Sequence, residues 1–186
     1  GHAHEDKQHN KLMVNSLRFY SSSSMTPRPL ILIDTGIIGG PGRGLIQLAS
    51  YLETKGLDYL VCSFSYRMPK SREFQEELRR LHLRATTVQQ SSVYDPKPVY
   101  EFCRLAKTGC FNLIQSHGYK SHVVALLVSR MLRLPWVAFA HGWTSEDRKV
   151  TLYHALDKIM LRFAQSVVTV SPPLQDLFSS LRGSRR

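Results

Sequence analysis

The 186-residue sequence contains no run of about 18 apolar residues, the length that a membrane-spanning helix requires. Its most apolar stretch, residues 122–140, is interrupted by Arg130, Arg133 and Pro135. Residues 11–20 are too polar to form the apolar part of a signal peptide. The three cysteines form no CxxC pair, which fits a reducing compartment. These absences argue against a membrane bundle and a disulfide framework, and they favour one cytoplasmic domain of ordinary size.

Several phosphate-binding and catalytic motifs are also missing. The stretch GPGRGL at residues 40–45 departs from the dinucleotide fingerprint GxGxxG at its last position, and no acidic residue ends the second predicted strand. There is no P-loop Gly-Lys-Ser/Thr and no GxSxG nucleophile elbow. No zinc-finger, RNA-recognition or helix-turn-helix signature is present. These gaps disfavour an NAD-dependent dehydrogenase, a P-loop enzyme and a nucleic-acid-binding domain.

Acidic residues are scarce relative to basic ones. Lysine and arginine number 25 against 14 aspartates and glutamates, so the formal net charge is +11. Such a charge is compatible with nucleic acid, an anionic membrane surface or a phosphorylated substrate. The basic residues are dispersed, however, with one small cluster at residues 182–186, and dispersed charge is more typical of a solvated surface. Charge alone therefore selects no partner.

What the sequence does contain is a regular alternation of short apolar runs and amphipathic segments. The apolar runs predict strands at residues 29–35, 58–65, 84–90, 111–118, 135–142 and 166–171. The amphipathic segments predict helices at residues 45–56, 71–83, 95–109, 121–132, 145–164 and 172–183. Strands that are apolar on both faces need helices on both sides. The predicted fold is a Rossmann-like, doubly wound parallel α/β sheet of about six strands, preceded by a tail at residues 1–28.

In such a fold, ligands bind outside the carboxyl ends of the strands. Four stretches follow predicted strands and carry polar or glycine residues: residues 36–44, residues 116–118, residues 141–144, and Ser171. The first holds five glycines before a helix, whose N-terminus offers free N–H groups and a positive dipole end. From the residues alone, this loop is either a phosphate cradle or a wide turn.

Two of these stretches contain a histidine followed by glycine. His117 and His141 end neighbouring predicted strands about 4.8 Å apart, so we expect them on the same rim of the sheet. They can hydrogen-bond a polyhydroxyl ligand or a phosphate, or act as acid or base near neutral pH. No third ligand with suitable spacing supports a metal site. Trp143 either stacks on a sugar ring or covers the sheet, and Thr144 is a candidate helix cap.

Together these stretches resemble the N-terminal half of retaining glycosyltransferases of family 4, which have the GT-B fold. The resemblance spans residues 29–183, and its order and spacing are more specific than any single motif. It is carried by residues 39–52 (GGPGRGLIQLASYL), residues 111–144 and residues 167–178 (VVTVSPPLQDLF). The family pattern begins with a Gly-Gly loop and a nearby arginine. A histidine follows the next matched strand, a His-Gly pair follows another strand, and a serine closes the last strand.

The resemblance implies roles for nine residues. His141 matches the active-site histidine that touches the donor sugar, and is the implied catalytic residue. The implied donor-binding residues are Gly39, Gly40 and Gly142. The implied acceptor- or phosphate-binding residues are Arg43, His117, Trp143, Thr144 and Ser171. Two departures affect the acceptor contacts: Gly42 stands where an acidic residue often precedes the arginine, and Asn112 stands where aspartate is common.

The same resemblance implies a nucleotide-sugar donor and a hydroxyl acceptor, with no cofactor and no metal required. The family's second Rossmann domain, with its paired glutamates, is absent from these residues, so we expect the 186 residues alone to be inactive. An anionic membrane surface is an implied partner, with residues 71–83 as the candidate contact and the cytoplasm or its membrane face as the location. No nucleic acid is expected. The alternative is a non-catalytic Rossmann-like module that binds a phosphorylated ligand or nucleic acid.

Overall fold

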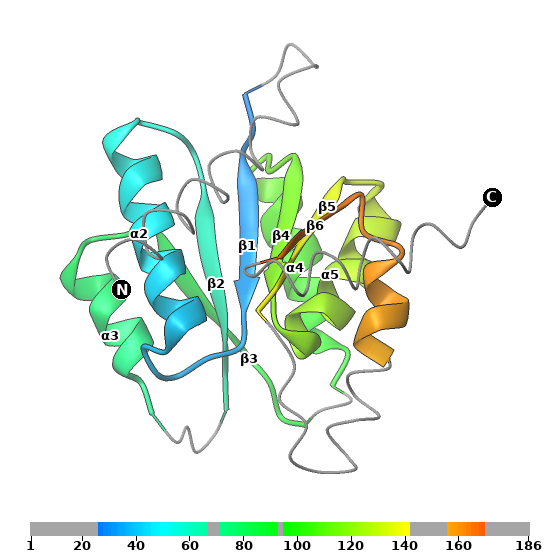
Figure 1. The fold of residues 1–186 in the computed structure, drawn as a ribbon, viewed down its shortest axis with the longest axis horizontal. Helices are drawn as coiled ribbons and strands as arrows, with labels where there is room; N and C mark the ends of the chain where they lie inside the picture. Colours follow the sequence, from blue (N-terminus) through cyan, green and yellow to red (C-terminus); the bar gives the residue numbers. More distant parts are fainter. Residues whose placement is uncertain (1–25, 67–70, 93–94, 142–155, 170–186) are drawn as a thin grey trace.

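A computed structural model describes residues 26–66, 71–92, 95–141 and 156–169, and shows a single parallel sheet between two layers of helices (Figure 1). The sheet has six strands in the order β3-β2-β1-β4-β5-β6. The strands are β1 (Pro29–Ile33), β2 (Leu60–Ser65), β3 (Ala85–Gln89), β4 (Leu113–His117), β5 (Trp136–Ala140) and β6 (Ser166–Thr169). The helices are α2 (Gly40–Thr54), α3 (Glu73–Arg80), α4 (Lys97–Thr108) and α5 (Tyr119–Leu132), with a further helical turn at residues 156–161. The predicted fold class is confirmed.

The order of the strands reverses between β1 and β4, which are neighbours in the sheet although two strands separate them in the sequence. Ile33 at the end of β1 pairs with His117 at the end of β4, and His117 pairs in turn with Phe139 of β5. In an open α/β sheet such a reversal opens a crevice beyond the carboxyl ends of the strands. The fold therefore places the ends of β1, β4 and β5 at the position where ligands bind.

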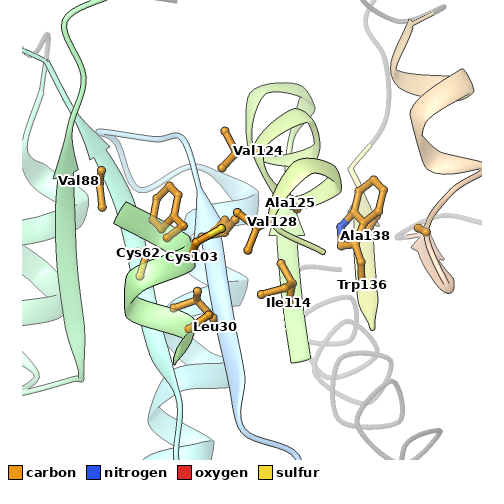
Figure 2. Close-up of a cluster of buried hydrophobic side chains, with 14 of the residues drawn as sticks. Leu30, Cys62, Val88, Cys103, Ile114, Val124, Ala125, Val128, Trp136 and Ala138 are labelled. Atoms are coloured by element: carbon orange, nitrogen blue, oxygen red, sulfur yellow. The ribbon is translucent and has the colours of Figure 1, made fainter. Parts of the chain in front are cut away.

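Two hydrophobic clusters fill the spaces on either side of the sheet, because successive residues of each strand point to opposite faces. Leu30 and Leu32 of β1 join the cluster beneath α4 and α5, shown in Figure 2, and Ile31 and Ile33 join the cluster beneath α2 and α3. Trp136 is buried on the α5 side, where its indole Nε1 donates a hydrogen bond of 2.7 Å to Ser116 Oγ. Both faces of β1 and β5 are buried, as their continuous apolar sequences require.

The largest difference from the predicted elements concerns the start of α2. The sequence predicts a helix from residue 45, but α2 begins at Gly40, and Gly39 caps it in an extended conformation with φ −83° and ψ −171°. Pro41 lies in its first turn, where the missing N–H costs nothing. Gly42 and Gly44 are buried inside the helix. Half of the glycine-rich stretch therefore belongs to the helix and not to a loop.

A buried tyrosine next to this core makes the stability of the fold sensitive to alkali. Burial raises the pKa of Tyr59 to about 12, and its hydroxyl accepts a hydrogen bond from the Arg84 N–H at 3.2 Å. The unfolded chain loses this proton near pH 10, so between pH 10 and 12 the folded state binds more protons and stability falls as pH rises. We expect Tyr59→Phe to reduce the loss of unfolding free energy between pH 10 and 12 by about 2 kcal/mol. Urea unfolding of both proteins across this range measures the difference. An equal slope for both would contradict the assignment.

Candidate functional site

The carboxyl edge of the sheet gathers the predicted site residues that the structure describes. Gly39 and Gly40 follow β1 at the start of α2, His117 is the last residue of β4, and His141 comes directly after β5. In Figure 1 the chain leaves β1 at the lower edge of the sheet and enters α2 there. Arg43 lies in α2 and is exposed. The remaining predicted site residues lie outside the described residues: Gly142, Trp143, Thr144 and Ser171.

The glycines after β1 fall into two groups according to what a side chain would meet. At Gly36 a Cβ would lie 2.4 Å from the Ser71 carbonyl oxygen, and at Gly42 it would lie 3.3 Å from the Phe74 ring. At Gly39 and Gly40 a Cβ would meet nothing within 4 Å. The first pair is therefore needed for packing within the protein. The second pair leaves the backbone open to a ligand.

The start of α2 carries no negative side chain of its own, although the Glu73 carboxylate of α3 accepts a hydrogen bond of 3.5 Å from the Ile38 N–H just before it. No acidic residue lies in its first turn, and no side chain caps it. The Arg43 N–H is bonded to the Gly39 carbonyl at 2.9 Å, which closes the first turn. The helix dipole and the exposed Arg43 both add positive charge at this end. An anionic group beside Gly39 and Gly40 would be stabilised there.

The two predicted histidines lie in contact. His117 Nδ1 and His141 Nε2 are 2.9 Å apart, and the two rings are stacked with centroids 5.2 Å apart. On its other side, His117 Nε2 is 2.8 Å from the amide nitrogen of Gln115, which lies two residues earlier on the same face of β4. The Phe139 ring stacks on His117 with centroids 4.6 Å apart. The structure therefore shows a row of three polar side chains, and Gln115 is the member that sequence reasoning missed.

A second polar cluster, also missed, lies at the same edge. Lys120, in the first turn of α5, has its ammonium group 4.0 Å from the centre of the Phe64 ring and 3.4 Å from an Asp34 carboxylate oxygen. The Tyr66 hydroxyl donates to Asp34 at 3.1 Å and contacts Lys120 Nζ. Burial lowers the pKa of Lys120 despite the nearby carboxylate, and burial with the Asp34 charge raises the pKa of Tyr66 to about 12. Asp34 directly follows β1 in the sequence, a signal that the strand-end rule could have used.

The chemistry available at this edge is hydrogen bonding and charge stabilisation. It provides imidazole groups, an ammonium group, a carboxylate, a phenol and a positively polarised helix start. Within the described residues, no group of three or more His, Cys, Asp or Glu side chains could hold a metal ion. The arrangement suits a polyhydroxyl ligand with an anionic part.

The predicted membrane contact on α3 has most of its charge balanced. Glu73, Glu76 and Glu77 lie on the same helix as its arginines, and Arg80 forms an ion pair with Glu77 at 2.7 Å. Arg84, just beyond the helix, pairs with Asp58 at 2.7 Å. No helix among the described residues has the length and apolarity needed to cross a membrane. Acidic and basic side chains are therefore nearly equal in number on α3, and the membrane contact stays a prediction.

Comparisons with known proteins agree with this fold. A family model, Glycosyltransferase Family 4, matches residues 38–186. No curated protein sequence matches the chain. HepE of Anabaena, solved in complex with UDP-glucose, is similar with a TM-score of 0.62 and 22% identity, over 75% of this chain and 36% of that one. MurG of Acinetobacter baumannii gives 0.55 and 14%, over 77% and 41%.

The same fold also occurs in an enzyme that is named for a different activity. UDP-GlcNAc 2-epimerase of Methanocaldococcus jannaschii is similar with a TM-score of 0.59 and 12% identity, over 86% of this chain and 43% of that one. These identities establish a shared fold alone, and the chain spans less than half the length of each of the three structures. The family match covers most of the chain and includes the start of α2 and both rim histidines. The chain belongs to glycosyltransferase family 4.

Proposed function

We propose that this chain is the acceptor-side half of a retaining glycosyltransferase, which transfers a sugar from a nucleotide-sugar donor to a hydroxyl acceptor. The observation that carries the proposal is the carboxyl edge of the sheet, which holds both the open start of α2 and the contacting His117 and His141, in a chain of family 4. The UDP-glucose bound to the similar structure of HepE supports a nucleotide-sugar donor. The substrates would bind in a cleft between this domain and a second domain. The 186 residues alone would therefore not catalyse sugar transfer.

In this proposal each described group has a chemical task. Gly39 and Gly40 let the backbone approach the donor diphosphate, and the positive end of α2 offsets the charge that builds on the leaving group. Arg43 adds to that field. His141 hydrogen-bonds the donor sugar, and His117 holds His141 in place. Because the helix dipole and Arg43 already supply positive charge, the reaction would need no metal ion.

The residues outside the described part of the chain keep the tasks that the family implies. Gly142 would lie on the donor side, and Trp143, Thr144 and Ser171 would bind the acceptor or a phosphate. Gly42, which stands in the place of an acidic residue, is buried against Phe74, so this chain needs another acidic group on the acceptor side. Asp34, at the carboxyl end of β1, is the described carboxylate best placed to supply it.

Substitution of the open glycine tests the proposal directly. We expect Gly39→Val to lower sugar transfer by about 100-fold, because its side chain would occupy the space beside the helix start where the diphosphate binds. Stability should fall by only about 1 kcal/mol, because valine is a poorer N-cap than glycine, while the φ of Gly39 suits any residue and a Cβ there would meet nothing within 4 Å. The measurement is transfer from UDP-glucose and related donors by the longer enzyme that includes the second domain.

A matched control lies further along the same helix. Gln47→Ala changes a side chain of α2 away from its start and should leave transfer unchanged. If the longer enzyme transfers no sugar from any nucleotide sugar but the chain still binds one, the alternative of a non-catalytic binding module holds. If Gly39→Val transfers sugar as well as the unmodified enzyme, the donor does not approach the start of α2.

A further inference from the structure

The hydrogen bonds in the row formed by Gln115, His117 and His141 run in one order from donor to acceptor. The proposed function does not require this order. Gln115 and His117 are 1% and 2% exposed and lie in the middle and at the end of the central strand β4. Three of the five residues of β4 are polar and buried, and burying the glutamine and the histidine without hydrogen bonds would cost several kcal/mol. Their mutual contact offsets that cost. Gln115 and His117 therefore supply hydrogen-bonding partners to each other inside the sheet.

The direction follows from counting protons. The Gln115 amide nitrogen faces His117 Nε2 at 2.8 Å, and an amide nitrogen only donates, so His117 Nε2 accepts. A neutral imidazole then carries its proton on Nδ1, and His117 Nδ1 donates to His141 Nε2 at 2.9 Å. His141 Nε2 is consequently an acceptor, and the proton of His141 is on Nδ1.

The same arrangement leaves no acceptor on His117 for a second proton at His141 Nε2. A second proton on His141 would occupy Nε2 and point at the N–H of His117, so two donors would face each other 2.9 Å apart. His117 can relieve this by moving its own proton to Nε2, and the Gln115 amide must then turn so that its oxygen, and not its nitrogen, faces that proton. The Phe139 ring, stacked at 13° on the imidazole of His117, restrains that ring from turning. A change of tautomer at His141 therefore requires a coupled change at His117 and Gln115.

We propose that Gln115 and His117 are positioning residues that fix the tautomer of His141, so that His141 acts as a hydrogen-bond donor through Nδ1 and not as a general base. The inference rests on the proposed function for the site, but the wiring of the row can be measured without it. It assigns Gln115 a role in specificity: a donor at Nδ1 selects a ligand oxygen that accepts, such as a sugar hydroxyl or a phosphate oxygen.

The tautomers can be read directly by NMR. In the chain labelled with ¹⁵N-histidine, long-range ¹H–¹⁵N spectra near neutral pH show which ring nitrogen carries the proton. We expect Nδ1–H for both His117 and His141, assigned by His117→Ala and His141→Ala. His122, whose Nδ1 is 2.7 Å from Asp157, and the exposed His82 serve as internal references for a fixed and a free ring. A proton on Nε2 of His141, or an imidazolium there, would overturn the proposal without any variant.

Two substitutions of Gln115 then test the cause. Gln115→Glu places an acceptor against His117 Nε2, so both rings should switch to the Nε2–H tautomer. Gln115→Met keeps the approximate size but has neither donor nor acceptor, and both rings should show a mixture of tautomers. Unchanged spectra in a folded Gln115→Glu protein would show that Gln115 does not set the tautomers. His122 should keep its tautomer in both variants.

Sugar transfer by the longer enzyme shows whether His141 acts as a hydrogen-bond donor or as a general base. His141→Ala should lower transfer by about 100-fold, and His141→Asn should recover at least a tenth of the activity because an amide N–H can donate but cannot take up a proton. A His141→Asn enzyme as inactive as His141→Ala would mean that His141 is a base, and would overturn the inference. Absence of transfer in the unmodified enzyme, with the predicted tautomers intact, would instead count against the proposed function alone.

Discussion

Gly36→Ala should lower the free energy of unfolding by about 3 kcal/mol, one of the two largest losses that we expect from a single substitution. The new Cβ would lie 2.4 Å from the carbonyl oxygen of Ser71 and 3.2 Å from its carbonyl carbon, so it collides with backbone and not with a side chain that can turn away. The adjacent carbonyl of Gly36 accepts the N–H of Phe74 at 3.1 Å. Moving this loop therefore also pulls on the start of α3.

The control for Gly36→Ala is the same substitution four positions later. Gly40→Ala adds its Cβ to empty space at the start of α2, and alanine favours a helix more than glycine does. We expect Gly40→Ala to change stability by less than about 1 kcal/mol, because the helix preference of alanine is opposed by the contact of its Cβ with Pro41, the next residue. Urea unfolding followed by circular dichroism compares the two variants with the unmodified chain. If Gly36→Ala unfolds at the same urea concentration as Gly40→Ala, the close contact with Ser71 does not constrain the fold.

This pair also shows what the sequence could and could not predict about the glycine-rich stretch. The sequence shows that a strand enters a helix through glycines, and that the spacing fits neither a dinucleotide fingerprint nor a P-loop. It cannot show which glycines pack against the protein, because Ser71 and Phe74 are more than 30 positions away from Gly36 and Gly42. Only the tertiary structure separates the packing glycines from the open ones.

The strands were predictable for a physical reason. A strand of a buried parallel sheet is apolar on both faces, so β1 and β5 read as continuous apolar runs with clear ends. Their parallel order then places every strand end that precedes a helix at one edge, which is why His117 and His141 could be expected on one rim. Their separation in the structure, 2.9 Å between ring nitrogens, follows from the pairing of β4 with β5.

The helix after β5 was less predictable. The sequence predicts one apolar face that includes Leu156, Met160 and Phe163, but Leu156 and Phe163 are 40% and 51% exposed, and Asp157 is buried instead. Asp157 accepts a hydrogen bond of 2.7 Å from His122 Nδ1 of α5, which offsets the free-energy cost of burying a carboxylate. No local pattern reveals such a pair, because its members are 35 positions apart. The same reason hid the contact of Lys120 with Asp34. Gln115 lies only two positions before His117, and it was missed because it falls inside a predicted strand and not after its end.

Phe139 connects the core of the fold with the site, and Phe139→Ala should therefore have a second large effect. Its ring is fully buried on the α2 side of the sheet and stacks on His117 at 4.6 Å. Removing a buried phenylalanine ring costs about 3–5 kcal/mol, from lost burial and from the cavity left behind. A domain has only about 5–15 kcal/mol of stability, so the variant should be close to unfolding at room temperature.

The milder Phe139→Leu separates the two roles of the ring. Leucine fills most of the volume, so the loss of stability should be at most about 1.5 kcal/mol, while the flat surface that restrains the imidazole of His117 is gone. We therefore expect Phe139→Leu to remain folded in urea titrations and to show a mixture of tautomers at His117 and His141. Tyr100→Ala, which removes an aromatic ring that is 66% exposed, should change neither stability nor tautomers. Fixed tautomers in folded Phe139→Leu would show that Gln115 alone orders the row, and a loss below about 1 kcal/mol in Phe139→Ala would show that the ring is not part of the core.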